Sequence, residues 1–563
     1  MGKEPDAPKV SQDVATLRPG QEQRAPRSEF QTAEAETVLF ASARALPVAD
    51  DALIARPTQR EAARFQIHPR RKWLSRVVLL LILVMQTLLT LRMNNTAFED
   101  EALYLYVGHL EIAHWLHGAA LQGDYPSYFS GAPVLYPMLG AAADSIGGLA
   151  AARAVSLLAM LAATSLVYAM SRRLFSERVA LCAALIFAVA EPTLFLSDLA
   201  TYDATALCLL ALAAWLVVRT AQFRWPVYLL AAPIVVLAVA TKYASLLWVP
   251  GIIALAGLAA WPRSGRKALI APITLAVTIA VLLYGTVYLA GPDYWRGITS
   301  TTLSRAQSTD PTSTLLWDCV QWIGLPVALA MVGTVAYAMR PATETASYIA
   351  SAGTKARRVL LGVVMTGSAL LAPADQIHIH TAVSLHKHVG FGLVFAAPIA
   401  GVGLARIVGD HFRRAQIGIA IWCGALALGM TQANDLFHDW PDSSVFIKDM
   451  AQYLRPGARY LSETDEVPIY YLRNHPDAQP DQFTSTYYFQ YVDKQGKFVT
   501  GDAAFVAAIQ AGYFQVVAFD NGATAATDAV IAHALATNPD YRLAAVIPND
   551  NNSGNQYIWV KSG

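Results

Sequence analysis

Long apolar segments separated by short polar connections occupy the chain between residues 73 and 432. Most of them have the length at which an α-helix crosses the roughly 30 Å hydrocarbon layer of a bilayer. Charged residues fall between the segments and rarely within them. The pattern predicts eleven membrane-spanning helices, at residues 73–91, 149–170, 180–196, 204–219, 226–241, 245–261, 268–290, 318–339, 359–373, 389–405 and 415–432.

The N-terminal end differs from this apolar region. Residues 1–72 are rich in Ala, Pro, Glu, Gln, Arg and Ser without sustained periodicity, which predicts a disordered tail. Arg70, Arg71 and Lys72 precede the first apolar run, and positive charge before a first span holds the N-terminus in the cytoplasm. That run also lies too far from Met1 for a cleaved signal peptide. We therefore expect a multi-pass protein of the inner (plasma) membrane with a cytoplasmic tail.

The C-terminal end returns to a polar composition at residues 438–563, after the predicted membrane region 73–437. Its periodicity predicts helices at 446–454, 502–511 and 527–536 and strands at 459–461, 514–519, 541–547 and 556–560. These elements predict a small α/β domain, which an odd number of spans places on the extracytoplasmic side. The aromatic run at residues 487–491 either stacks on a sugar or supplies half of a strand's core.

Composition narrows the class of protein. The 563 residues are 55% hydrophobic and only 15% charged, and the mean hydropathy is +0.36, which excludes an ordinary soluble protein. The formal net charge is +1, and no basic domain stands out that could bind a nucleic acid. The four cysteines lie inside apolar segments without CxxC or Cys/His metal spacing, so we interpret them as packing residues.

Basic residues alternate with the predicted spans. All five connections predicted to face the cytoplasm are basic, namely 171–179, 219–224, 262–267, 340–358 and 406–414. The opposite loops hold only isolated basic residues, so the positive-inside rule supports this arrangement at every turn. The outer face therefore collects the unusual residues of the chain.

The outer loop at 92–148 opens with three consecutive acids, Glu99, Asp100 and Glu101, just past the first span. Charge at a membrane edge is costly unless it faces water or serves chemistry. Further charged groups on this side are Asp198 and Asp203 at a helix turn, Lys242, Asp375, and the segment His386-Lys387-His388. We interpret Asp100 as a catalytic base on this face, while a solvated loop or a helix N-terminus is the plain alternative for the acidic cluster.

The other candidates also have plainer explanations. Lys242 can extend to lipid headgroups, and His386-Lys387-His388 can form a positive helix start that faces them. Asp198 and Asp203 can cap adjacent helices. Asp375, His378 and His380 can surround a metal or lie in a solvated loop.

These residues together resemble a known family. A cytoplasmic N-terminus, an Asp100-Glu101 pair soon after the first span and an outer C-terminal domain are similar to the GT-C glycosyltransferases. Within these, the chain resembles the family 39-type group of protein O-mannosyltransferases, lipid A aminoarabinose transferases and Rgt-like sugar transferases. Matching segments are Gly131-Ala132-Pro133-Val134-Leu135-Tyr136-Pro137, Asp198 and Asp203, Thr241-Lys242-Tyr243, and His386-Lys387-His388-Val389-Gly390-Phe391-Gly392.

The resemblance implies a polyprenyl-phosphate sugar as donor and a glycan, lipid or protein hydroxyl as acceptor in cell-envelope glycan biosynthesis. It implies Asp100 as the base, Glu101 as a positioning group, and Glu99 as the rival base. Positive charge must stabilise the departing phosphate. Binding residues implied for the substrates are Arg92, Asp198, Asp203, Lys242, Tyr243, His386, Lys387 and His388.

One departure from the pattern concerns the arginine, which lies close before Asp-Glu in the family, whereas Arg92 stands eight residues before Asp100. The resemblance implies no cofactor, and the need for a divalent metal stays open. We therefore expect a membrane glycosyltransferase without a nucleic-acid partner. The alternative is a transporter or flippase for lipid-linked sugars, and a third reading is a membrane scaffold.

Overall fold

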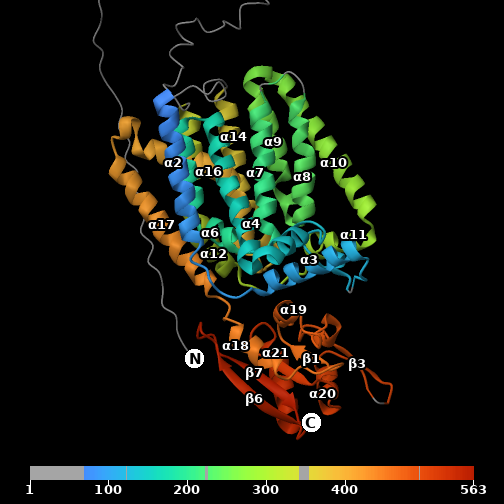
Figure 1. Ribbon diagram of the computed structural model, residues 1–563. Helices are drawn as coiled ribbons and strands as arrows, with labels where there is room; N and C mark the ends of the chain where they lie inside the picture. Colours follow the sequence, from blue (N-terminus) through green and yellow to red (C-terminus); the bar gives the residue numbers. More distant parts are fainter. Residues whose placement is uncertain are drawn as a thin grey trace, which may run out of the picture. The chain divides into compact units, whose positions relative to one another are not determined.

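The structure is a computed structural model that describes residues 69–121, 123–221, 223, 226–340, 354–493 and 495–562. Residues 1–68 of the predicted tail at 1–72 and the middle of the predicted connection at 340–358 lie outside the described residues. Residues 69–72 were predicted to belong to the tail but form the first turn of helix α2. The first part of the chain is helical, with elements that reach from α2 to α17 (Figure 1). Its helices are α2 (Pro69–Thr90), α3 (Glu99–His117), α4 (Tyr136–Leu174), α5 (Glu177–Val189), α6 (Glu191–Asp198), α7 (Tyr202–Thr220), α8 (Ala231–Thr241), α9 (Val249–Ser264), α10 (Ile270–Ala290), α11 (Pro292–Ile298), α12 (Thr312–Met339), α14 (Lys355–Ser368), α15 (Leu371–His378), α16 (Leu385–Val408) and α17 (Ala415–Phe437).

Several of these helices are suited to a membrane. By length and composition, seven described stretches can cross one, or up to nine if each of two bent helix pairs is one span. One of the seven, residues 243–290, contains both α9 and α10 joined by a short turn, and α8 belongs to a shorter apolar helix. Each of the eleven predicted spans overlaps a helix of the described chain. The chain is a multi-pass α-helical membrane protein, as its sequence predicts.

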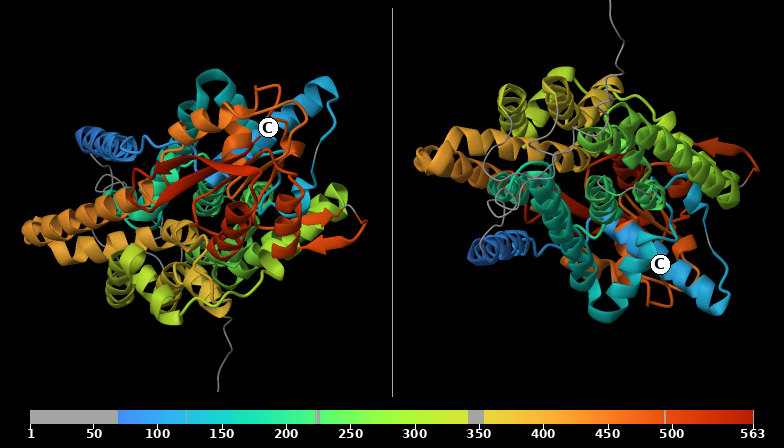
Figure 2. Two further views of the ribbon diagram at one scale, coloured as in Figure 1. Left: turned by 90° about the horizontal axis from the view of Figure 1, so that it is seen from below. Right: turned by 90° about the horizontal axis from the view of Figure 1, so that it is seen from above.

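Burial separates the centre of the bundle from its edge. In α16, 83% of the apolar stretch that could span a membrane is buried inside the protein, against 17% in α2 and 11% in α17. Seen along the bundle, α2 and α17 lie at its edge (Figure 2). Small residues allow the close approach around α16: a Cβ on Gly403 would lie 2.1 Å from the Leu329 carbonyl oxygen of α12. This packing holds α16 at the centre of the bundle, and Lys387 lies in the first turn of the same helix.

The predicted outer loop at 92–148 is more ordered than a loop. It holds α3, a short 3₁₀ turn at Tyr125–Ser127 and the first part of α4, which has non-helical dihedral angles at Gly147 and Gly148. Apolar residues on one face of α3, among them Ala102, Leu105 and Tyr106, are buried. Helix α3 lies across the ends of the bundle helices in Figure 1 and packs against α4 and α19. The acidic cluster is thus the first turn of a packed helix.

The C-terminal part contains a mixed five-stranded sheet of order β2-β1-β5-β7-β6. The three strands β1, β2 and β5 are parallel, whereas β7 is antiparallel to both β5 and β6. The predicted helices and strands of this part are present, and α19, β2 and the β3–β4 hairpin are added to them. Its elements are α18 (Ser444–Ala451), β1 (Tyr460–Ser462), α19 (Glu466–Leu472), β2 (Phe483–Thr484), β3 (Gln490–Val492), β4 (Phe498–Thr500), α20 (Asp502–Gln510), β5 (Val516–Phe519), α21 (Ala525–Thr537), β6 (Tyr541–Pro548) and β7 (Asn555–Lys561).

The aromatic run at 487–491 is partly buried and partly exposed. Phe489 is buried and stacks on Phe505, whereas Tyr487 and Tyr488 are exposed. The run therefore contributes to the core with one ring and presents two others to the surface.

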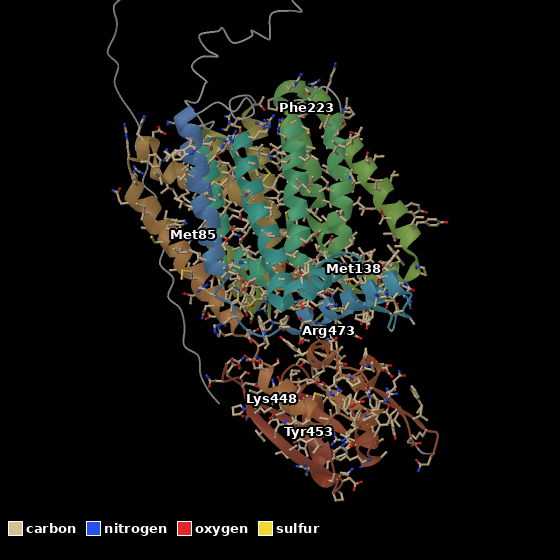
Figure 3. All side chains as sticks on the ribbon, in the orientation of Figure 1. Met85, Met138, Phe223, Lys448, Tyr453 and Arg473 are labelled. Atoms are coloured by element: carbon tan, nitrogen blue, oxygen red, sulfur yellow. The ribbon has the colours of Figure 1, made fainter. Side chains whose placement is uncertain are left out.

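A buried carboxylate, Asp144 of α4, joins the helical part to the sheet part. It accepts hydrogen bonds from the Tyr470 hydroxyl at 2.6 Å and from Arg473 at 2.9 Å, and His109 Nε2 of α3 lies 2.6 Å away. Figure 3 shows Arg473 at the boundary between the two parts. One buried apolar cluster contains both Leu105 and residues of the sheet part such as Tyr460. The C-terminal part is therefore packed on α3.

A second buried carboxylate, Glu101, fixes the start of α3. Arg153 of α4 donates to both of its oxygens, at 2.9 and 2.7 Å, and the backbone N–H groups of Phe98 and Ala200 donate at 3.0 and 2.7 Å. Arg153 also donates to the Asn95 carbonyl at 2.8 Å. With every lone-pair direction used, this desolvated pair ties α3 to α4 and to the connection between α6 and α7.

Replacement of Arg153 by methionine is therefore expected to destabilise the protein by about 3–5 kcal/mol, because it leaves the Glu101 carboxylate buried without a partner. The measurement is the thermal unfolding of the detergent-solubilised protein followed by fluorescence. Arg172→Met on the same helix is the matched control, since Arg172 pairs with Glu177 at the surface, where its side chain is 54% exposed. We expect the control to change stability by less than about 1 kcal/mol. Equal unfolding temperatures for the two variants would contradict this role of Arg153.

Candidate active site

Asp100 stands at the second position of α3, next to the anchored Glu101. Consecutive residues of a helix point about 100° apart, so fixing Glu101 also fixes the directions of its neighbours. The three acids Glu99, Asp100 and Glu101 all lie in the first turn, where the positive end of the helix dipole favours negative charge. Glu101 points into the protein and Asp100 points toward the start of α16.

The Asp100 carboxylate is held by one ammonium group and one hydroxyl. Lys387 Nζ donates to Oδ2 at 2.5 Å, and the Tyr104 hydroxyl, one helical turn further along α3, donates to Oδ1 at 3.1 Å. The Lys387 side chain is 5% exposed, whereas that of Asp100 is 28% exposed. Asp100 is therefore the member of this pair that a ligand can reach.

Hydroxyl groups continue from Asp100 to a second ammonium. The hydroxyls of Tyr104 and Tyr202 lie 2.6 Å apart, Ser130 Oγ is hydrogen-bonded to Tyr202, and Lys242 Nζ donates to Ser130 Oγ at 3.3 Å. Each hydroxyl has a single proton to donate, and Tyr104 gives its proton to Asp100. Tyr202 must then donate to Tyr104 and Ser130 to Tyr202. The chain runs in one direction, from the Lys242 ammonium to the Asp100 carboxylate.

Lys242 has a carboxylate of its own. Its Nζ lies 3.3 Å from Asp203 Oδ1, and both side chains are nearly buried, at 6% and 1% exposure. Thr201 Oγ1 donates to the other Asp203 oxygen at 3.1 Å, and the Lys242 ammonium lies 4.6 Å from the centre of the Tyr202 ring. The site thus contains two carboxylates and two ammonium groups, which balance in charge.

Backbone pairing brings Ser130 and Lys242 together. The Tyr243 N–H donates to the Ser130 carbonyl at 2.9 Å, and the Ala132 N–H donates to the Ala240 carbonyl at 2.8 Å. A Cβ on Gly131 would lie 2.0 Å from the Thr241 carbonyl oxygen, so only glycine permits this approach. The segments Gly131-Ala132-Pro133 and Thr241-Lys242-Tyr243, both noted in the sequence, are therefore neighbours.

The pKa values of Asp100 and Glu99 differ in direction. Burial opposes the charged form of Asp100, but the nearby Lys387 ammonium outweighs it and holds the pKa of Asp100 below its ordinary value. Glu99 points to the opposite side, and burial, followed by the charges of Asp100 and Glu466, raises its pKa to about 7. The adjacent acids therefore differ in basicity because only one of them faces an ammonium.

Other candidates from the sequence lie outside this network. Arg92 donates to the carbonyls of Leu89 and Met430, at 2.8 and 3.2 Å, and its guanidinium lies 5.9 Å from the Phe437 ring centre. Asp198 is buried near Arg153 and Glu101, and its Oδ2 has no hydrogen-bond partner among the described residues.

The residues that flank Lys387 and Lys242 make contacts other than with Asp100, and of these His388 and Tyr243 are buried while His386 is half-buried. His388 Nδ1 is hydrogen-bonded to Gln376 at 2.9 Å, and His386 packs edge-on against Phe195. Tyr243 is buried, and its hydroxyl lacks a partner among the described residues. Of the predicted binding residues, the structure brings Lys387, Lys242 and Asp203 together with Asp100, whereas Glu101 is a structural anchor.

Four residues of the site were not singled out from the sequence: Tyr104, Tyr202, Ser130 and Arg153. A helical reading of the acidic cluster would have placed Tyr104 one turn from Asp100. Ser130 and Tyr202 adjoin segments that were noted, but only the fold shows that they meet. Among the described residues, no group of three or more His, Cys, Asp or Glu side chains is arranged to hold a metal ion.

Comparison with known proteins identifies a related sequence family and similar folds. The sequence model of the dolichyl-phosphate-mannose-protein mannosyltransferase family matches residues 132–288. No curated protein sequence matches this chain.

Among solved structures, ArnT from Cupriavidus metallidurans bound to undecaprenyl phosphate superposes with a TM-score of 0.56 at 14% identity, covering 88% of this chain and 98% of that one. The archaeal oligosaccharyltransferase AglB from Archaeoglobus fulgidus, in complex with an inhibitory peptide and a dolichol-phosphate, superposes with a TM-score of 0.51 at 14% identity, covering 86% of this chain and 74% of that one. The chain therefore has the fold of the GT-C glycosyltransferases, and the resemblance predicted from its sequence is confirmed.

Proposed function

We propose that this protein is a membrane glycosyltransferase that moves a sugar from a polyprenyl-phosphate sugar to an acceptor hydroxyl, with Asp100 as general base. The observation that carries the proposal is a partly open carboxylate placed beside two nearly buried ammonium groups at the end of an apolar helix bundle. The fold and the matched family model are those of enzymes that transfer sugars, and two solved relatives hold a polyprenyl or dolichol phosphate.

The two lysines suit a lipid-linked phosphate. The lipid tail of such a donor lies in the bilayer, and its phosphate sits at the membrane edge. Negative charge grows on the phosphate as the bond to the sugar breaks, and a nearby ammonium in a partly dry site stabilises that charge. Lys387 and Lys242 are prepositioned for this, because packed helix ends hold them and little water reaches them.

The base suits the acceptor hydroxyl. The hydroxyl must lose its proton as its oxygen attacks the anomeric carbon, and a carboxylate within hydrogen-bond reach can accept that proton. In the structure Lys387 depresses the basicity of Asp100. When a donor phosphate binds Lys387, this depression weakens, so donor binding would itself prepare Asp100 to act.

The proposal places the site on the extracytoplasmic face. The basic residues Arg172, Arg219 and Arg263 lie at the C-terminal ends of α4, α7 and α9. Because the helices alternate in direction through the bundle, these ends lie on the side opposite Asp100. The positive-inside rule assigns that end to the cytoplasm, so the site and the C-terminal part face outward.

Glu99 is a second candidate for the base, because its raised pKa of about 7 is well matched to neutral pH. Asp100 is preferred since it alone of the two contacts an ammonium suited to the donor phosphate. The alternative from another class is a transporter of lipid-linked sugars. A transferase consumes its donor, whereas a transporter moves the lipid-linked sugar unchanged, so donor consumption distinguishes the two.

Asp100→Asn is expected to lower kcat/KM for sugar transfer by about 10²–10⁴-fold, because the amide accepts no proton. The measurement is transfer from a panel of radiolabelled polyprenyl-phosphate sugars in membranes at matched expression. Asp124→Asn is the control, since Asp124 lies in the same outer segment with a side chain that is 50% exposed and pairs with Arg296 at the surface. Full transfer by Asp100→Asn would remove it from the mechanism and turn attention to Glu99.

Lys387→Met is expected to lower kcat/KM by about 10²-fold and to move the acidic limb of the pH profile upward. Lys387 holds the pKa of Asp100 down, so its removal raises that pKa. A base works only when deprotonated, and activity is therefore lost at a higher pH as pH falls. The measurement is kcat/KM for sugar transfer as a function of pH, between about pH 4 and 8. Lys448→Met is the control, because Lys448 is exposed. An acidic limb at the wild-type pH would show that Lys387 does not control the pKa of the base.

A further inference from the structure

A cavity of about 290 Å³ opens on the far side of Asp100, between the start of α3 and the sheet part. Its walls include Phe98 and Glu99 before and within α3, Trp440 after α17, and Asp520 after β5. The volume is close to the lower end of the roughly 300–1,000 Å³ of small-molecule sites. It is suited to a small ligand group.

This cavity and the donor site share a wall. The Phe98 ring packs against Trp440, with centroids 5.2 Å apart, and the Lys387 ammonium lies 5.3 Å from the centre of the same Phe98 ring. Glu99, the neighbour of Asp100, lines the cavity. A group bound there would therefore lie next to the proposed base.

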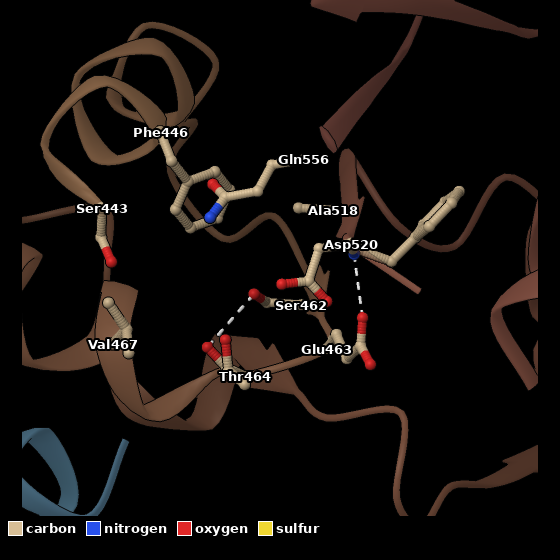
Figure 4. Close-up of a pocket in the computed structure, with 10 residues that line it drawn as sticks. Ser443, Phe446, Ser462, Glu463, Thr464, Val467, Ala518, Asp520 and Gln556 are labelled. Carbon is tan, nitrogen blue, oxygen red and sulfur yellow. Dashed lines mark hydrogen bonds between the residues drawn. The ribbon is translucent and has the colours of Figure 1, made fainter. Parts of the chain in front are cut away.

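The charge of the cavity is one-sided. Four acids line the cavity, namely Glu99, Asp439, Glu463 and Asp520. No Lys, Arg or His stands among the described residues of its lining. Glu463 is fixed by the backbone N–H groups of Asp520 and Thr524, each at 2.9 Å. Figure 4 shows a neighbouring, smaller pocket that shares Glu463 and Asp520 with this cavity, with the Asp520 N–H directed at Glu463. An anionic ligand would meet this acidic lining with no basic side chain to compensate its charge.

The polar lining suits hydroxyl groups. The amides of Asn521, Asn549 and Gln556 offer both donors and acceptors, and the oxygen Oε1 of Gln556 has no hydrogen-bond partner among the described residues. Burial, with the adjacent Glu463 carboxylate, raises the pKa of Asp520 to about 7, so this acid can also donate. Trp440 and Phe98 add apolar ring surface for the C–H face of a sugar.

We propose that this cavity binds the terminal sugar of a neutral glycan acceptor. Aromatic rings provide the apolar contact, while amides and carboxyl groups bind the hydroxyls. The inference rests on the proposed function and deepens it, because it selects among glycan, lipid and protein acceptors. Phosphorylated glycolipids are disfavoured by the acidic lining, and a purely cationic group would leave the amide donors unused.

The test uses membranes that contain the full-length protein and a radiolabelled polyprenyl-phosphate sugar that the wild type consumes. The labelled product is digested with protease and separated by anion exchange. We expect the label in a neutral, protease-resistant glycan fraction. Label in the anionic fraction, in a cation-binding fraction or in protease-sensitive material would overturn the inference.

A variant locates the acceptor. Ala523 is exposed and lines the cavity, so Ala523→Trp fills the space without removing a hydrogen bond of its side chain. We expect the apparent KM for added neutral glycan fraction to rise about tenfold, while donor hydrolysis to water without added acceptor stays at the wild-type rate. Ala525→Trp is the matched control, because Ala525 is also exposed but lies outside the cavity lining.

The outcomes separate the two proposals. If the wild type consumes no donor, the proposed function fails. If donor is consumed but Ala523→Trp keeps the wild-type KM for the glycan fraction, the cavity is not the acceptor site and the proposed function stands. A variant that also loses donor hydrolysis is misfolded, and Asp439→Lys, with Asp435→Lys as its control, then decides by the same KM criterion.

Discussion

The arrangement at the bundle end depends on the ion pair between Arg153 and Glu101. Burying either group alone would be costly, and the pair is stable because two side-chain hydrogen bonds and two backbone N–H groups saturate the carboxylate. The same contacts hold the first turn of α3 against α4 and against Ala200, two residues before Tyr202. A single buried carboxylate therefore fixes both the direction of Asp100 and the start of α7, from which Tyr202 and Asp203 come.

Charge balance explains why the site can stay nearly dry. Lys387 and Lys242 would each be unstable in this position without a carboxylate nearby. Asp100 and Asp203 supply the opposite charges, and the hydroxyls of Tyr104, Tyr202 and Ser130 join the two pairs without adding charge. The balance is complete without a ligand, so under the proposed function an arriving phosphate would compete with Asp100 for Lys387. That competition would couple donor binding to the basicity of Asp100, because any contact that occupies Lys387 releases the carboxylate.

Sequence patterns predicted much of the fold and less of the site. Apolar runs are long and separated by basic turns, so the helical ranges followed from hydropathy, as did the main elements of the sheet part. The start of α3 was left open as either a loop or a helix N-terminus, because an acidic first turn suits both, although the buried face of α3 repeats at helical spacing. Asp100, Lys387, Lys242 and Asp203, which the structure brings together, were singled out because charge near a membrane is conspicuous. Arg92 was equally conspicuous, but hydropathy carries no information about which way a side chain at a helix end turns.

The two adjacent acids at the start of α3 suggest how one short segment serves two substrates. Neighbouring positions on a helix diverge by about 100°, so Asp100 faces the lysines while Glu99 faces the cavity beside the sheet part. A donor held by its phosphate and an acceptor held by its sugar would then approach the same turn of helix from opposite sides. Their reacting atoms would meet beside Asp100, which is partly open. The anchor at Glu101 makes this geometry rigid, since a rotation of α3 that favoured one side would break the hydrogen bonds of the buried carboxylate.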